Sequence, residues 1–293
     1  MIDISIGIMA YNEAANIGRL LEQVRGQQPA GATIVEIIVV ASGCTDDTAA
    51  IVAGHAARDP RVTLLLQEHR EGKASAINLF LARASGEVLV LESGDTVPDD
   101  GAIEHLVAPF TDPRVGMTGA RPVPVDPPDH FTGHCTQLLW NLHHAIALET
   151  PKLGELVAFR RVVREIPADT AVDEASIEAL VRAAGLDLRY VPEAVVRNKG
   201  PETVADLVRQ RRRIAAGHRH LAGRGYRVST GSPWRALKAL AATGDWRGPR
   251  RFTWTVGAVL LEGWSRLLGA WDLSVRRRNP VVWDTAVSTK RLD

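Results

Sequence analysis

The chain has 293 residues, of which 45% are apolar and 24% are charged, as is typical of a soluble globular protein. This composition excludes a disordered tail, a collagen-like rod and a polytopic membrane protein, and two cysteines cannot form a disulfide framework or a four-ligand zinc site. The first residues show neither the basic region nor the cleavage site of a signal peptide, so we expect a cytoplasmic protein.

The near-neutral net charge of +1 conceals an uneven distribution along the chain. Residues 2–196 have a balance of −12, whereas residues 197–293 have a balance of +13 and contain six of the seven tryptophans. A basic, tryptophan-rich end favours contact with an anionic substrate or surface. The basic residues match no nucleic-acid-binding motif, so we predict no nucleic-acid partner.

Short apolar segments alternate with helical patterns over the first hundred residues. The predicted strands are 4–10, 34–40, 62–66 and 87–91, and the predicted helices are 13–25, 46–57 and 73–84. This alternation is typical of βαβ units and predicts an α/β fold with a Rossmann-like, mostly parallel mixed sheet flanked by helices. Ligands of such sheets bind at the carboxyl ends of the strands, so the loops after Ala10, Val40 and Leu91 should hold the site.

The later part of the chain is predicted to be mostly helical. One helix is expected over 175–184, ended by Gly185, and another follows Pro201. We expect residues 1–225 to form one domain with halves at about 1–115 and 116–225, and residues 226–293 to form an amphipathic helical extension. An apolar stripe in this extension either packs on the domain or lies in a bilayer interface; it consists of Gly257, Leu260, Trp264, Leu267 and Trp271.

Three common ligand-binding signatures are absent from the sequence. There is no Gly-x-Gly-x-x-Gly after the first strand, no Gly-x-x-x-x-Gly-Lys-Ser/Thr and no Gly-x-Ser-x-Gly. Their absence argues against a dehydrogenase, a P-loop NTPase and an α/β-hydrolase.

Six segments in chain order resemble the motifs of family-2 glycosyltransferases, whose fold is of the GT-A type. They are Met9–Glu13, Ile37–Thr48, Gly72–Asn78, Ser93–Asp99, Val172–Glu174 and Gln210–Gly217. The resemblance spans about residues 4–220. It implies transfer of a sugar, with inversion, from a nucleotide-sugar (UDP- or GDP-linked) to the hydroxyl of a lipid, a lipid-linked sugar or a small metabolite.

The resemblance also implies roles for individual residues. The donor-binding residues would be Ala10, Tyr11, Asn12, Glu13, Ser42, Asp46, Lys73, Ser93, Gly94, Gln210 and Arg213. A departing diphosphate needs its charge neutralised, for which Asp95 would hold Mg²⁺ or Mn²⁺. The acceptor hydroxyl needs a general base, and either Asp173 or Glu174 would provide it.

Several positions depart from the family pattern. Ala41 and Ser42 stand where two acidic residues are usual, and Ser93 replaces the first Asp of Asp-x-Asp, with Glu92 before it as a substitute ligand. Ile214 replaces the tryptophan of processive members, which favours a single transfer.

Each candidate also has a structural interpretation. Asp46 could cap a helix, Arg211–Arg213 could form a solvated face, and Glu155 could contact the acceptor or support the fold. His218 could reach the metal, although it lacks a metal-ligand spacing.

Two other functions are consistent with the same fold. One is a non-catalytic binding scaffold. The other is a nucleotidyltransferase, which should have a glycine-rich, arginine-containing loop where Tyr11-Asn12-Glu13 stands. The basic end favours a cytoplasmic enzyme that can bind peripherally to the inner face of a membrane.

Overall fold

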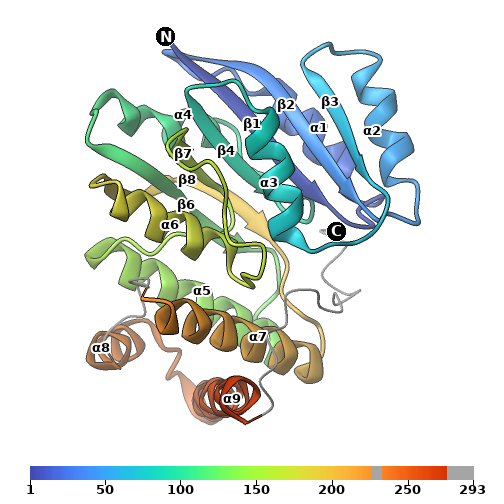
Figure 1. The fold of residues 1–293 in the computed structure, drawn as a ribbon. Coiled ribbons are helices and arrows are strands. Elements are labelled where there is room, and N and C mark those ends of the chain that lie inside the picture. Colours follow the sequence, from blue (N-terminus) through green and yellow to red (C-terminus); the bar gives the residue numbers. More distant parts are fainter. Residues whose placement is uncertain (226–232, 276–293) are drawn as a thin grey trace.

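The computed structural model describes residues 1–225 and 233–275, and its centre is one mixed sheet (Figure 1). The strand order is β3-β2-β1-β4-β7-β6-β8-β5. The strands are β1 Ile2–Ala10, β2 Ala32–Ser42, β3 Val62–Gln67, β4 Val88–Ser93, β5 Val97–Pro98, β6 Val115–Pro124, β7 Val157–Arg160 and β8 Asp187–Asn198. β3, β2, β1 and β4 are parallel, β6 is parallel to β8, and β7 runs antiparallel to both β4 and β6. The predicted α/β class with a mostly parallel mixed sheet is confirmed.

Helices cover both faces of this sheet. They are α1 Ile17–Gly26, α2 Thr48–Ala56, α3 Lys73–Arg83, α4 Ala102–Val107, α5 Phe131–Glu149, α6 Asp173–Ala183, α7 Val204–Gly223, α8 Pro233–Thr243 and α9 Gly248–Ser274, with a 3₁₀ turn at Ala108–Thr111. Because side chains alternate along a strand, Ile4, Ile6 and Ile8 pack with α1, α2 and α4, whereas alternate residues of β2 and β4 pack with α3 and α6.

The first helix begins later than the sequence pattern predicts. It was expected from Glu13 but starts at Ile17, because the preceding residues are held in a loop. Asn12 adopts a left-handed conformation with φ of 53°, and the Glu13 amide donates to the Thr48 hydroxyl at 2.7 Å. The sixth helix starts at Asp173 rather than 175, which places both candidate bases in its first turn.

Four helices, α5, α7, α8 and α9, gather at one end of the molecule (Figure 1). α7 and α9 approach closely at Gly269, where a Cβ atom would lie 2.7 Å from the Arg212 carbonyl oxygen. The predicted domain boundary falls at residues 226–232, which lie outside the described residues, as do Trp283 and the other residues of 276–293.

Candidate active site

The loop after β1 is cross-linked to the loop after β2. The Asn12 side-chain amide donates to the Thr45 hydroxyl at 3.1 Å, and the Thr45 backbone amide donates back to Asn12 Oδ1 at 2.8 Å. The Tyr11 ring lies 4.1 Å below the Arg70 guanidinium. Ala10–Glu13 therefore lie where the sequence predicted them, at the carboxyl edge of the parallel strands.

Asp46 uses both of its carboxylate oxygens within these loops. Oδ1 accepts from the Thr48 amide at 3.1 Å and hydroxyl at 2.5 Å, and Oδ2 accepts from the Ala14 amide at 3.0 Å. Burial opposes ionisation, but these hydrogen bonds outweigh it and lower the pKa of Asp46. This geometry supports the structural interpretation, in which Asp46 joins the loop before α1 to the start of α2.

Lys73 connects three segments that are distant in sequence. Its Nζ donates to Glu174 Oε1 at 3.0 Å and to the Ser93 hydroxyl at 3.2 Å, and lies 3.8 Å from Asp173 Oδ2. Burial of the ammonium works against its charge, but Glu174 and Asp173 outweigh this and raise the pKa of Lys73. The structure thus brings together Lys73, which was predicted to bind the nucleotide-sugar, and both candidate general bases.

Asp173 and Glu174 occupy different environments although they are adjacent. The Asp173 side chain is only 4% exposed, and its Oδ1 has no hydrogen-bond partner among the described residues. Burial and the neighbouring Glu174 charge raise the pKa of Asp173 to about 6, against the opposing effect of Lys73. The Glu174 side chain is 20% exposed, and Lys73 overcomes its burial and lowers its pKa.

Acidic side chains crowd the turn after β4, where Asp95 lies. Glu92 is buried; its Oε1 accepts from the Thr96 hydroxyl, and its Oε2 is unpartnered in the described part of the chain. Burial and the nearby Glu155 and Asp95 charges raise the pKa of Glu92 to about 8. Burial, Asp95 and Glu174 likewise raise the pKa of Glu155 to about 7. Glu155, expected on the acceptor side, is thus also an electrostatic neighbour of Asp95.

These carboxyl groups fit a hard divalent cation. Burial, together with neighbouring negative charge, raises the pKa values of Glu92 and Glu155, and a bound cation would favour their ionised forms. Glu92 Oε2 has no hydrogen-bond partner among the described residues and is available to a cation. Within residues 1–225 and 233–275, however, no three His, Cys, Asp or Glu side chains are arranged as a metal-binding group. Mg²⁺ is commonly held by one or two carboxylates together with substrate phosphates, and the arrangement around Asp95 suits that mode.

The three consecutive arginines of α7 divide between two roles. Arg211 donates to both oxygens of Glu262, and Arg212 pairs with Asp272, so both bind α9. Arg213 instead donates to the Ala171 carbonyl at 3.3 Å. Its electrostatic neighbours are the carboxyl groups of the candidate site: Asp173, Glu174, Glu155 and Asp95. The predicted distinction of Arg213 from its neighbours agrees with this arrangement.

A cationic group that sequence reasoning missed lies on the α5 and α7 side. Burial and the charges of Arg211 and Arg266 lower the pKa of Lys152 to about 8. Lys152 is also an electrostatic neighbour of His143 and His218, whose Nδ1 atoms are buried without a partner among the described residues. His218 is thus surrounded mainly by cations, which disfavours the predicted metal contact. No short-range pattern signals this group, because its members come from α5, a loop, α7 and α9.

The family of the chain follows from comparison with known sequences. Residues 5–165, more than half of the chain, match the family model described as "Glycosyl transferase family 2". The chain belongs to glycosyl transferase family 2. This confirms the family predicted from the six motifs.

Relatives of this family-2 chain include glycosyltransferase AglE of Haloferax volcanii, which is 28% identical over 116 residues. That alignment covers 40% of this chain and only 38% of AglE. Among solved structures, the mannosyltransferase PcManGT from Pyrobaculum calidifontis, in complex with GDP-Man and Mn²⁺, has a TM-score of 0.62 and 23% identity over 94% of this chain and 86% of its own. Glucosyl-3-phosphoglycerate synthase from Mycobacterium tuberculosis, in complex with Mn²⁺, UDP and glucosyl-3-phosphoglycerate, has a TM-score of 0.56 and 22% identity over 78% of this chain and 82% of its own.

The structural likeness confirms the predicted GT-A fold for this family-2 chain. Family membership also favours a glycosyl transferase over a nucleotidyltransferase, in agreement with Tyr11-Asn12-Glu13 in place of a glycine-rich loop.

Proposed function

We propose that this chain transfers a sugar from a nucleotide-sugar donor to an acceptor hydroxyl with inversion of the anomeric centre. The observation that supports this most strongly is the Lys73 ammonium, held between Ser93 and Glu174 at the carboxyl ends of the strands. Glu155 is an electrostatic neighbour of both Lys73 and Asp95. In one displacement, a carboxylate takes the acceptor proton while the acceptor oxygen bonds to the anomeric carbon. The bond from that carbon to the diphosphate breaks on the opposite face, so the configuration inverts.

We assign the general base to Glu174 and a positioning role to Asp173. A base must come within hydrogen-bond reach of the hydroxyl, and Glu174 is the more exposed of the two carboxylates. The charge of Lys73 keeps Glu174 ionised and therefore able to accept a proton. Asp173 lies deeper and helps to hold Lys73 and Arg213.

Charge on the departing diphosphate is balanced by cations in this proposal. Asp95, with Glu92 beside it, would hold Mg²⁺ or Mn²⁺, which would neutralise the phosphate oxygens when bound. Further hydrogen-bond donors to the diphosphate come from Lys73 on α3 and from Gln210 and Arg213 on α7. The GDP-Man, UDP and Mn²⁺ in the two related structures support a UDP- or GDP-linked donor and a divalent cation.

The acceptor is proposed to bear an anionic group near its hydroxyl. Arg211 and Arg266 both donate to the carboxylate of Glu262. Lys152, an electrostatic neighbour of all three, adds a further positive charge, so this one carboxylate does not balance the three cations. A phosphate or carboxylate on a lipid or a small metabolite would balance the remaining positive charge. We also propose that each reaction adds a single sugar, because Ile214 stands where processive members of the family have a tryptophan.

The donor part of this proposal is tested by titrating UDP, GDP, CDP and dTDP, each with and without Mn²⁺, into the wild type and Asp95→Asn. Asp187→Asn, at an exposed position on β8, is the matched control. We expect one nucleotide to bind in a Mn²⁺-dependent manner, with at least about tenfold weaker binding in Asp95→Asn only. Absence of nucleotide binding under all conditions would contradict the proposal and favour the non-catalytic scaffold.

A further inference from the structure

Helix α9 exposes its apolar face to solvent. Leu260, Trp264, Leu267 and Trp271 are 69%, 58%, 65% and 54% exposed, respectively. Their spacings of four, three and four residues align them along one side of the helix. We call these four residues the α9 stripe. Isolated exposed apolar residues are ordinary, but a continuous row of large ones marks an interaction surface.

The opposite face of α9 holds the helix on the body of the protein through apolar packing of Ala258 and Leu261 and through polar contacts. Thr255, Ser265 and Asp272 are buried on this side, and Glu262 and Asp272 pair with Arg211 and Arg212 of α7. The inner face of α9 is therefore already occupied by contacts with the body of the protein, which leaves the α9 stripe on the outer face. Turning the stripe inward would break these ion pairs, so the body of the protein is not the partner of the stripe.

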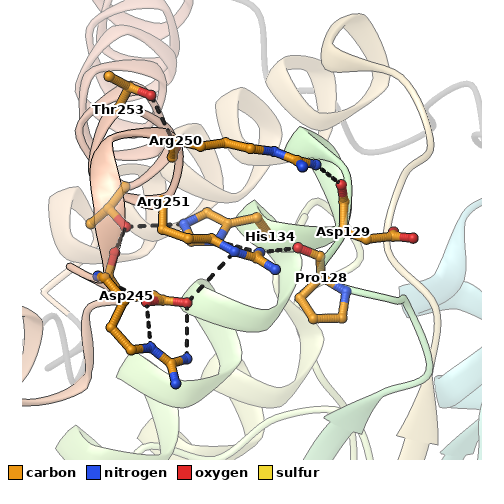
Figure 2. A network of polar contacts seen from close by, with 9 residues as sticks. Pro128, Asp129, His134, Asp245, Arg250, Arg251 and Thr253 are labelled. Carbon is orange, nitrogen blue, oxygen red and sulfur yellow. Dashed lines mark hydrogen bonds and ion pairs between the residues drawn. The ribbon is translucent and has the colours of Figure 1, made fainter.

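Polar contacts also fix the start of α9 to α5 and the segment before it (Figure 2). The Thr255 hydroxyl donates to the Asp245 carbonyl at 3.0 Å and accepts from His134 Nε2 at 3.0 Å. Arg250 and Arg251 donate to the carbonyl oxygens of Asp129 and Pro128. These contacts determine which side of α9 faces outward.

The exposed charge on α9 and at its start is mainly positive. The side chains of Arg247, just before α9, and of Arg266, on α9, are 90% and 62% exposed, whereas their ion-pair partners are much less exposed. The acidic residues of α9 and of the turn before it are ion-paired and at most 22% exposed; they are Asp245, Glu262 and Asp272. An approaching surface therefore meets leucine and tryptophan together with Arg247 and Arg266, which we call the cationic border.

We propose that the α9 stripe docks on an anionic lipid bilayer, with α9 lying in the plane of the interface. Tryptophan and leucine insert below the headgroups, and Arg247 and Arg266 contact anionic headgroups. In the described ranges, no helix is long and apolar enough to cross a bilayer. A second copy of the chain is the less suitable occupant, because it would bring a like-charged border against this one. The docking does not depend on the proposed sugar transfer.

The test is sedimentation of the full chain with vesicles of phosphatidylcholine alone and with about 30% phosphatidylglycerol. Leu267→Glu is compared with Leu66→Glu, because Leu66 is 68% exposed on β3, the far edge strand of the sheet. We expect the wild type and Leu66→Glu to bind the anionic vesicles, and Leu267→Glu to bind at least about tenfold more weakly. Trp264→Gln, which adds no charge, should weaken binding in the same direction.

Two results would overturn the proposal. One is that Leu267→Glu, folded as judged by circular dichroism, sediments with anionic vesicles as well as Leu66→Glu does. The other is that the wild type ignores vesicles but dimerises in analytical ultracentrifugation, and that Leu267→Glu abolishes the dimer, which would make the stripe a self-interface. A blue shift of tryptophan fluorescence on vesicle addition, lost in Leu267→Glu, would support docking.

Discussion

Lys73 shows how one buried cation orders the residues around it. Two carboxylates and a hydroxyl converge on its Nζ, and removal of that charge would leave Asp173 and Glu174 buried together without compensation. The same cation separates their pKa values, because it contacts Glu174 more closely than Asp173. Glu174 is kept ionised, whereas the pKa of Asp173 is raised to about 6.

The first prediction concerns the general base. Glu174→Gln should lower the rate constant for transfer by about 10²- to 10⁴-fold, while nucleotide binding changes little. Because Lys73 lowers the pKa of Glu174 below its usual 4.5, the wild-type rate should stay level from neutral pH to about 5. Rate measurements from pH 5 to 8 test this. A decline centred near pH 6, together with a loss of rate in Asp173→Asn that is larger than the loss in Glu174→Gln, would identify Asp173 as the base instead.

A second prediction concerns the buried imidazole of His143. Burial and nearby cations lower its pKa to about 3 in the folded protein, whereas an unfolded histidine has a pKa of 6.5. Between these values the unfolded chain binds a proton that the folded chain does not, so the free energy of unfolding decreases as the pH falls below 6.5. Urea unfolding at pH 7.5 and 5.0 should show a smaller decrease in His143→Phe. The exposed-site control His69→Phe should keep the wild-type decrease.

At the scale of elements, the contact between α7 and α9 depends on small residues and ion pairs. Gly269 lies against the Arg212 carbonyl and Ala215, and Arg211 and Arg212 pair with acidic residues of α9. Arg211 and Arg212 therefore act within the helical layer, whereas Arg213, on the same helix, faces the candidate site.

This contact predicts opposite effects of one substitution at two glycines of α9. Gly269→Ala should reduce the free energy of unfolding by about 1–3 kcal/mol, because the new Cβ would lie 2.7 Å from the Arg212 carbonyl oxygen. Gly263→Ala has open space around its Cβ and should increase stability by about 0.5–1 kcal/mol. Urea unfolding measures both. Equal effects of the two substitutions would contradict the close approach of the helices.

At the scale of the whole molecule, charge and apolar surface are divided between the two ends of the chain. The acidic balance of residues 2–196 accompanies the sheet and its crowded carboxylates, and the basic balance accompanies α7 and the α9 stripe. An anionic bilayer would attract the basic end and repel the acidic one, which would orient the protein on the surface.

The whole-molecule prediction is a steep salt dependence of binding to anionic vesicles. Raising the ionic strength from about 0.05 to 0.5 M shortens the Debye length and should release most of the bound protein, because headgroup contacts are screened. Sedimentation at several salt concentrations measures this. Binding that is independent of salt and equal on neutral vesicles would contradict the role of the cationic border.

The fold class and family could be predicted from sequence, because strand periodicity and short motifs are local properties. Short apolar runs predicted the four parallel strands to within about two residues at each end. The motifs assigned Lys73, Ser93 and Glu174 to one site, and the structure brings the Ser93 and Glu174 side chains within hydrogen-bond distance of Lys73. The later start of α1 could not be predicted, because it depends on hydrogen bonds that Asn12 and Glu13 donate to the hydroxyls of Thr45 and Thr48, which are distant in sequence.

The sequence by itself determined the alternating α/β pattern, the family motifs and the division of charge, because each depends only on the order of residues along the chain. Only the tertiary structure decided that Arg211 and Arg212 bind α9, how Lys73 separates the pKa values of Asp173 and Glu174, and which side of α9 is exposed. The physical reason is that burial and ion pairing depend on residues brought together from distant segments. The apolar period of α9 indicated an amphipathic helix, but the partners of its inner face determined its orientation.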